Sequence, residues 1–87
     1  MSLNATPNPF NQFTTVHYSG LAGKETGLAI YNLEGKMIRK FKITGKTNGS
    51  IIWNGIDMQG NPMASGIYIA RVLNGSHSLK TRLMLFR

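Results

Sequence analysis

The chain has 87 residues, enough for one hydrophobic core but not for two. It contains no cysteine, which excludes disulfide frameworks, cysteine-based zinc sites and thiol nucleophiles. Lysine and arginine number 10 against 3 acidic residues, so the formal net charge of +7 favours anionic partners. No apolar run approaches the ~18 residues that cross a bilayer, and no membrane span is expected.

The first thirteen residues are predicted to precede the folded domain. Residues 1–3 resemble a cloning-tag remnant, and Pro7 and Pro9 hold their predecessors extended while removing two backbone N–H donors. We therefore expect residues 1–13 to be a tag remnant followed by a linker from an upstream domain. Residues 14–87 are expected to form the domain itself.

From Thr14 onwards, short segments alternate between apolar and polar residues, and no window has the spacing of an amphipathic helix. Glycine-containing turns separate them, at Glu34-Gly35, Asn48-Gly49, Asn54-Gly55, Gly60-Asn61-Pro62 and Asn74-Gly75. This pattern predicts an all-β fold, an Ig-like β-sandwich of about seven short antiparallel strands. Two hairpins are indicated most strongly, one joining residues 28–33 to 36–43 and the other joining residues 67–73 to 76–86.

Basic residues crowd the first of these hairpins, at Lys36, Arg39, Lys40, Lys42 and Lys46. Tyr31 or Phe41 would be available for stacking with a nucleic acid. No nucleic-acid-binding motif accompanies the charges, and Phe41 shares its parity with Met37 and Ile43, which suits the core. We interpret the hairpin as solvated and do not expect nucleic acid as a partner. Binding of an anionic polysaccharide or lipopolysaccharide at the same face is an alternative.

A dense run of turn-forming residues lies between Trp53 and Tyr68. Its side-chain oxygens, which calcium would require, belong to Asn54, Asp57, Gln59 and Asn61. Calcium sites usually contain several carboxylates, whereas Asp57 provides the only one here. The composition favours a turn in which Asn54 and Asp57 accept hydrogen bonds from backbone amides. No metal site is therefore expected.

The same run has a structural role in the prediction. Trp53 is expected to end a strand in the core, and Gly55 and Gly60 to adopt left-handed conformations. The chain then crosses the sandwich to Gly66 and Tyr68, where the last hairpin begins.

The sequence offers little for catalysis. Glu25, Glu34 and Asp57 are its only carboxylates, and the first two fall at predicted turns, which argues against a paired-carboxylate glycosidase. Ser65, His77 and Asp57 lack the strand–turn–helix context of a Ser-His-Asp set. We therefore expect no enzyme activity, no catalytic residue and no cofactor.

The last predicted strand has two different faces. Leu83 and Leu85 share the parity that points to the core. The opposite parity carries Lys80, Arg82, Met84 and Phe86. Either a neighbouring loop covers these side chains, or the strand is central in its sheet, or it offers an apolar and basic strip to a partner. If it lies at an edge, a partner strand could also add alongside it.

Four stretches together resemble one known family. They are residues 7–11 with 14–18 (PNPFN, TTVHY), residues 28–36 (LAIYNLEGK), residues 53–57, 60 and 64–68 (WNGID, G, ASGIY), and residues 82–87 (RLMLFR). Their order and spacing resemble the C-terminal sorting domains of type IX secretion system cargo proteins (Por secretion system type A). That family is similar to the Ig-like domain of the flagellar hook-capping protein. Arg82 and Asn54 depart from its pattern, which usually has lysine and aspartate at these positions.

The resemblance implies a non-catalytic module that directs a secreted cargo through the periplasm and across the outer membrane to the cell surface. The partners that it implies are an outer-membrane translocon, a sortase-like peptidase and an upstream cargo domain, with anionic lipopolysaccharide as a further candidate. We assign the sorting signal to Lys80, Arg82, Leu83, Met84, Leu85, Phe86 and Arg87, of which residues 82–87 match the terminal element of the family. The resemblance assigns a structural motif to Pro7, Asn8, Pro9, Trp53, Asp57, Gly60, Gly66 and Tyr68.

Two alternatives stand beside this function. The first is an accessory Ig-like domain that supports an extracellular glycosidase or peptidase and has no export role. The second is a surface module that binds anionic polysaccharide through the basic hairpin.

Overall fold

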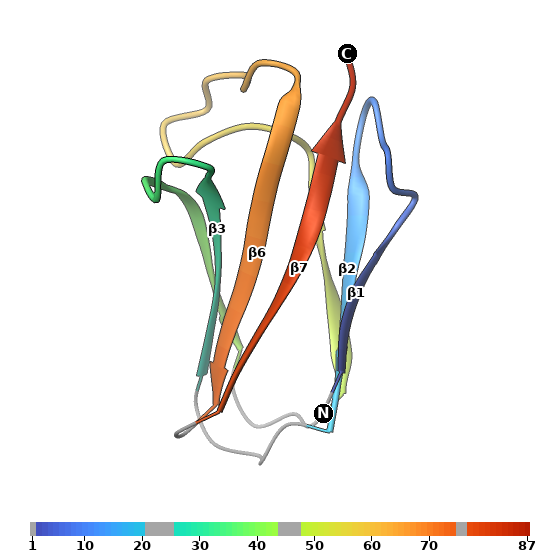
Figure 1. Ribbon diagram of the computed structural model, residues 1–87, viewed down its shortest axis with the longest axis vertical. Coiled ribbons are helices and arrows are strands. Elements are labelled where there is room, and N and C mark those ends of the chain that lie inside the picture. The colour runs from blue at the N-terminus through green and yellow to red at the C-terminus, as the bar shows by residue number, and fades with distance from the viewer. Residues whose placement is uncertain (1, 21–25, 44–47, 75–76) are drawn as a thin grey trace.

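A computed structural model of the chain describes residues 2–20, 26–43, 48–74 and 77–87. Its strands are β1 (Ser2–Thr6), β2 (Thr14–Ser19), β3 (Thr26–Asn32), β4 (Met37–Ile43), β5 (Gly49–Trp53), β6 (Gly66–Asn74) and β7 (His77–Leu85). They form a sheet of order β1-β2-β5 and a sheet of order β4-β3-β6-β7, antiparallel throughout (Figure 1). The predicted all-β, Ig-like sandwich is thereby confirmed. Within the described residues there is no helix that could span a membrane.

The structure places a strand where the sequence analysis expects a tag remnant and a linker. β1 pairs with β2 from Ser2 opposite Ser19 to Thr6 opposite Thr15. Only Leu3 and Ala5 of its five residues are apolar, and these two face the core. These two residues do alternate with polar ones, but two apolar positions are too few for the alternation to predict a strand from the sequence.

Both predicted hairpins are confirmed, because β3 pairs with β4 and β6 pairs with β7. The turn expected at Asn74-Gly75 includes residues outside the described part of the chain. Met37 was expected on the core parity, but it is 46% exposed, whereas Ile38 is 7% exposed. The register shifts opposite Ile30 and Tyr31, so that Ile38 is an extra residue on β4. Such a bulge reverses the parity of the residues beyond it.

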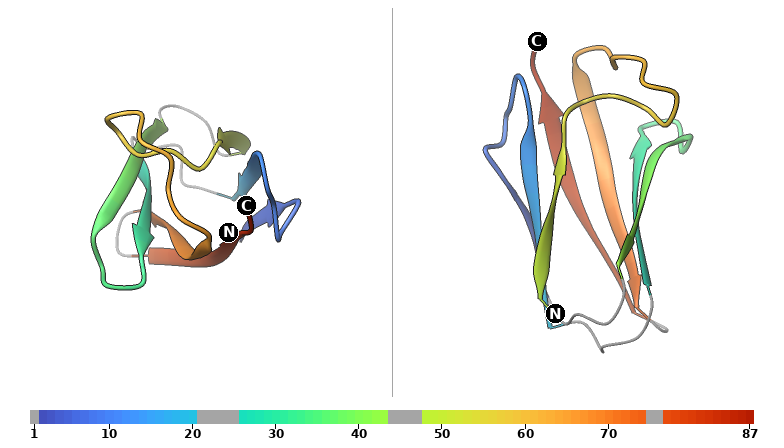
Figure 2. Two further views of the ribbon diagram at one scale, coloured as in Figure 1. Left: turned by 90° about the horizontal axis from the view of Figure 1, so that it is seen from above. Right: turned by 180° about the vertical axis from the view of Figure 1, so that it is seen from behind.

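Three aromatic rings join the two sheets in the core, around the fully buried Trp53. Its ring meets Phe10 edge-on at a centroid distance of 5.7 Å and Tyr68 at 5.3 Å. The indole Nε1 donates a hydrogen bond of 2.8 Å to the carbonyl oxygen of Ile56. The prediction that Trp53 ends a strand in the core is confirmed, and the view along the strands shows both sheets enclosing this interior (Figure 2).

Gly49 lies in a strand rather than in the expected turn with Asn48. It begins β5, opposite Tyr18 of β2. A Cβ atom at this position would lie 2.5 Å from the Tyr18 hydroxyl oxygen. The glycine therefore allows the tyrosine side chain to lie across β5, and it supplies no positive φ.

Candidate functional site

The predicted division of the last strand into a buried face and an accessible face is confirmed. Leu83 and Leu85 are buried in the core. On the opposite face Lys80 and Arg82 are exposed and Met84 is half-buried. Phe86, just beyond the end of β7, has 74% of its surface exposed. We call these four accessible residues, Lys80, Arg82, Met84 and Phe86, the terminal strip.

The outer edge of β7 is covered by the loop of residues 7–11. Asn8 donates from Nδ2 to the carbonyl of Arg82 at 2.7 Å and accepts at Oδ1 from the amide of Met84 at 2.8 Å. The Phe10 amide donates to the Met84 carbonyl at 2.9 Å, and its carbonyl accepts from the Phe86 amide at 2.8 Å. Phe10 thus forms a parallel bridge to Leu85. Addition of a partner strand along residues 82–86, one of the sequence-based alternatives, would require displacing this loop.

The 7–11 loop is itself fixed from inside the sandwich. Thr14, fully buried at the start of β2, donates from Oγ1 to the carbonyl of Pro7 at 2.8 Å. Phe10 is buried against Trp53, and the Thr6-Pro7 and Asn8-Pro9 peptide bonds are cis. The core aromatics therefore anchor the loop that covers β7.

The loop of residues 54–65 holds the end of the chain. The Arg87 side chain donates from Nε to the Met63 carbonyl at 2.8 Å and from Nη2 to the Gly55 carbonyl at 2.9 Å. Its backbone amide donates to Ser65 Oγ at 2.9 Å. Gly55 has φ 77°, and a Cβ atom there would lie 2.6 Å from Nη2. The glycine is required both for the turn and for the close approach of the guanidinium.

The same loop is shaped by Asp57, whose Oδ1 accepts from the amides of Gln59 at 2.9 Å and Asn61 at 2.8 Å. These bonds, led by that from the Asn61 amide, hold the pKa of Asp57 below its usual value of 3.8, against a smaller opposing effect of desolvation. The turn interpretation is confirmed for Asp57, and Gly60 has the expected positive φ. Asn54 is exposed, and among the described residues its side chain accepts no hydrogen bond, contrary to the expectation for this position. In the described residues no cluster of metal-ligating side chains occurs.

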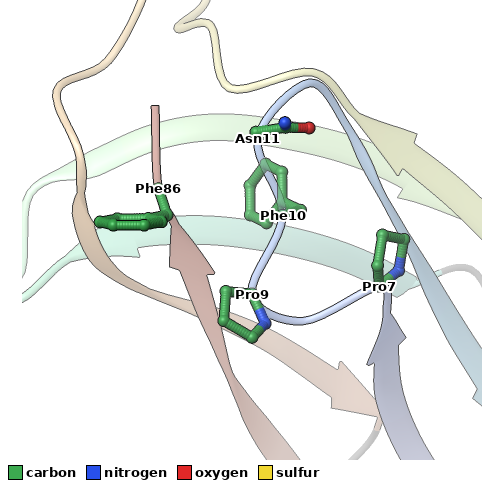
Figure 3. A pocket seen from close by; sticks show the side chains of 5 residues that line it. All are labelled: Pro7, Pro9, Phe10, Asn11 and Phe86. Atoms are coloured by element: carbon green, nitrogen blue, oxygen red, sulfur yellow. The ribbon is translucent and has the colours of Figure 1, made fainter.

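Two hollows flank Phe86 at the end of the sandwich where the C-terminus lies (Figure 1), and Figure 3 shows the side chains that line one of them. One, of about 320 Å³, is lined by Phe86 with Pro7, Pro9, Phe10 and Asn11. The other, of about 490 Å³, is lined by Phe86 with Pro9, Ser65, Gly66, Ile67, Met84 and Leu85. Met84 lies opposite Ile67 in the β6–β7 register. Phe86 and Met84 therefore belong to one apolar surface that continues the basic part of the terminal strip.

Tyr68 connects this region to the core. Its hydroxyl donates to the Ala64 carbonyl at 2.7 Å, which closes the 54–65 loop onto β6. Burial raises the pKa of the Tyr68 hydroxyl, and the positive charge of Arg87 opposes that rise. The phenol therefore stays neutral and serves as a hydrogen-bond donor at physiological pH.

The cations of the β3–β4 hairpin do not form one patch. Arg39 lies over the ring of Phe41, with its guanidinium carbon 5.0 Å from the ring centroid. Phe41 is opposite the buried Leu28, whereas Lys40 is opposite Ala29 on the outer face of the sheet. Lys46 lies outside the described residues. The expected basic hairpin is thus divided between the two faces of β4.

Sequence reasoning missed the contacts that position the terminal strip. Asn8 bonds to residues 82 and 84, and Arg87 bonds to residues 55 and 63. The only signal was the density of proline, asparagine and glycine in both loops, which predicts a turn but not the strand that the turn contacts.

Comparison with known proteins identifies a matching family and solved structures of similar fold. The family model described as secretion system C-terminal sorting domain matches residues 4–85. PorZ of Porphyromonas gingivalis, an essential bacterial surface component of the type-IX secretion system, is 25% identical with a TM-score of 0.72. The match covers 99% of this chain and 12% of PorZ.

The second structure is dimeric latent PorU from the same organism. It is 15% identical with a TM-score of 0.67, and the match covers 95% of this chain and 9% of PorU. At this identity the likeness concerns the fold alone. Among curated protein sequences there is no match.

Proposed function

The chain belongs to the secretion system C-terminal sorting domain family, and on this premise we propose that it directs an attached cargo across the outer membrane through the type IX secretion system. The observation that carries the proposal is the family match over residues 4–85. Members of this family are sorting signals, which implies contact with the secretion machinery and delivery to the cell surface or the exterior.

The terminal strip is the surface that we propose for recognition. Leu83 and Leu85 are buried and Arg87 is bound by the 54–65 loop, so these residues position the strip rather than contact a partner. Phe86, exposed between two hollows, offers the kind of aromatic anchor that dominates protein interfaces.

Side chains, not the strand edge, are the proposed contacts. The backbone of residues 82–86 is already paired with Asn8 and Phe10, so a partner strand could not add there without displacing the 7–11 loop. In this proposal an outer-membrane translocon binds the side chains of Arg82, Met84 and Phe86 while the cargo passes out of the periplasm. A sortase-like peptidase then acts on the junction with the upstream cargo, and the domain itself catalyses nothing.

A fusion experiment tests this function. Residues 1–87 are attached to the C-terminus of a periplasmic reporter in a host with the type IX machinery and in a matched host lacking the translocon, with the unfused reporter as a control. We expect the reporter at the cell surface or in the medium only for the fusion in the competent host. An accessory Ig-like domain without an export role predicts retention of the fusion in both hosts, and that result would overturn the proposal.

A truncation is a poor version of this test. Removing residues 82–87 also removes the buried Leu83 and Leu85 and the bonds of Arg87, so loss of export could follow from unfolding. Point variants at exposed positions of the terminal strip avoid this difficulty.

A further inference from the structure

A row of basic side chains crosses the outer face of the four-stranded sheet. The register places Lys40 of β4 opposite Ala29 of β3, Ala29 opposite Arg71 of β6, and Arg71 opposite Lys80 of β7. Directly opposite residues project from the same face of a sheet. Leu28 and Ile30 beside Ala29, and Ala70 and Val72 beside Arg71, are buried in the core, so the row faces outward. We call Lys40, Arg71 and Lys80 the basic row.

The sheet surface is hollow on both sides of Arg71. A hollow of about 220 Å³ is lined by Gly27, Ala29, Tyr31, Met37, Lys40 and Arg71. A second, of about 310 Å³, is lined by Tyr31, Asn32, Gly35, Ile69, Arg71 and Lys80. The first exists because β3 carries only Gly27 and Ala29 between the long side chains of its neighbours. Arg71 and Tyr31 line both hollows and therefore lie between them.

The charge of the basic row has no counter-ion within the described residues. Glu34 and Asp57 are the side-chain carboxylates among the described residues, and no ion pair joins either of them to the basic row there. Arg71 Nε is moreover buried without a hydrogen-bond acceptor. A buried N–H group without an acceptor is destabilising, so the guanidinium is not neutralised from inside the sheet, and an anion from outside the chain would have to approach its Nη groups.

We propose that the basic row and its two hollows form a binding site for an acidic polysaccharide. Arg71 would pair through its planar guanidinium with a carboxylate or phosphate carried on a sugar, a geometry that suits both groups. Lys40 and Lys80 would hold acidic groups on the neighbouring sugars, and the half-buried Tyr31 would lie beside a sugar ring.

The surface fits this ligand better than a nucleic acid. Binding of single strands uses several aromatic side chains on which successive bases stack, whereas Tyr31 is the only aromatic residue that lines the two hollows. The site also lies across the middle of the sheet and includes Gly27 and Arg71, so it differs from the basic hairpin considered from the sequence. Lys80 of β7 belongs to both the basic row and the terminal strip, but the proposed site does not include the apolar end of the strip.

Titration of the whole chain with oligogalacturonate tests the proposal, with neutral dextran and a single-stranded oligonucleotide of equal charge as comparison ligands. We expect saturable binding of oligogalacturonate at 0.15 M salt, where the screening length is about 8 Å. The backbone NMR chemical shifts should change along β3, along β6 and in the first half of β7. Absence of saturable binding, or equal affinity for the oligonucleotide, would overturn the proposal.

Three variants locate the site. Arg71→Gln should weaken binding by roughly tenfold or more, as expected for loss of charge-assisted hydrogen bonds. Lys36→Gln removes the same unit of charge at the exposed β3–β4 turn and should change the affinity by no more than about twofold. Ala29→Leu keeps every charge but fills the first hollow, and it should also weaken binding.

Thermal denaturation shows whether each variant is folded before its affinity is compared. If Arg71→Gln and Lys36→Gln lose equal affinity for oligogalacturonate, binding depends only on the net charge of the protein, and the proposed site is contradicted. The assay uses no secretion machinery, so its outcome is independent of the proposed export function.

Discussion

Asn8→Ala removes the two side-chain hydrogen bonds that cover the edge of β7. The wild-type Asn8 bonds to the carbonyl of Arg82 and to the amide of Met84. A neutral hydrogen bond contributes about 0.5–1.5 kcal/mol net, so the variant should lose roughly 1–3 kcal/mol of unfolding free energy. For a domain of this size the melting temperature should fall by roughly 5–20 °C.

Urea denaturation and amide hydrogen exchange measure this effect. The midpoint should fall without a change in slope, and the Met84 amide should exchange faster because its acceptor has gone. Asn11→Ala is the matched control, since Asn11 is an exposed residue of the same loop and its side chain forms no hydrogen bond within the described residues. If Asn8→Ala and Asn11→Ala have equal stability and equal Met84 protection, the loop does not hold the strand edge as described.

Three further predictions concern the 54–65 loop and its borders. Gly55→Ala should cost roughly 0.5–1.5 kcal/mol more than Gly35→Ala, because both have positive φ but only the new Cβ at residue 55 would push the Arg87 guanidinium from its hydrogen bond to the Gly55 carbonyl; urea midpoints compare them. Trp53→Ala should cost roughly 3–5 kcal/mol, and a calorimetric melting temperature near the wild-type value would contradict its place in the core. The lowered pKa of Asp57 means that its carboxylate stabilises the fold above about pH 4 and that this contribution is lost as the pH falls through the folded-state pKa. Asp57→Asn should therefore show a smaller loss of stability as the pH is lowered below about 4 in acid titrations followed by circular dichroism.

The parts of the fold that depend on local pattern could be predicted. Alternating bulky residues identified both hairpins, and the turn at Glu34-Gly35 is present, with Gly35 at φ 87°. Trp53 was placed correctly because a lone tryptophan at the end of an apolar run has few positions other than the core.

The rest depends on partners that are distant in the sequence. β1 forms because β2 offers a free edge, and Ile38 replaces Met37 in the core because a bulge on β4 shifts the register. Asn8 finds its partners 74 and 76 residues away. None of these contacts could be predicted from the local sequence. The family resemblance identifies the residues of a motif but not the contacts that they make.

The candidate surfaces divide in the same way. Alternation alone separated the buried Leu83 and Leu85 from the accessible terminal strip. The basic row could not be predicted, because its three cations come from three strands and only the register aligns them. The sequence instead suggested the β3–β4 hairpin, whose charges the structure divides between two faces.

The exported fraction of a reporter fused to the Phe86→Ala variant tests the central claim most directly. Ile52→Ala is the matched control, because Ile52 is 61% exposed on β5 in the other sheet and its truncation also leaves the core intact. If the terminal strip is the recognised surface, export of Phe86→Ala should fall by roughly tenfold or more, as for an aromatic interface anchor, while Ile52→Ala is exported like the wild type. Equal export of both variants at equal stability would contradict the claim.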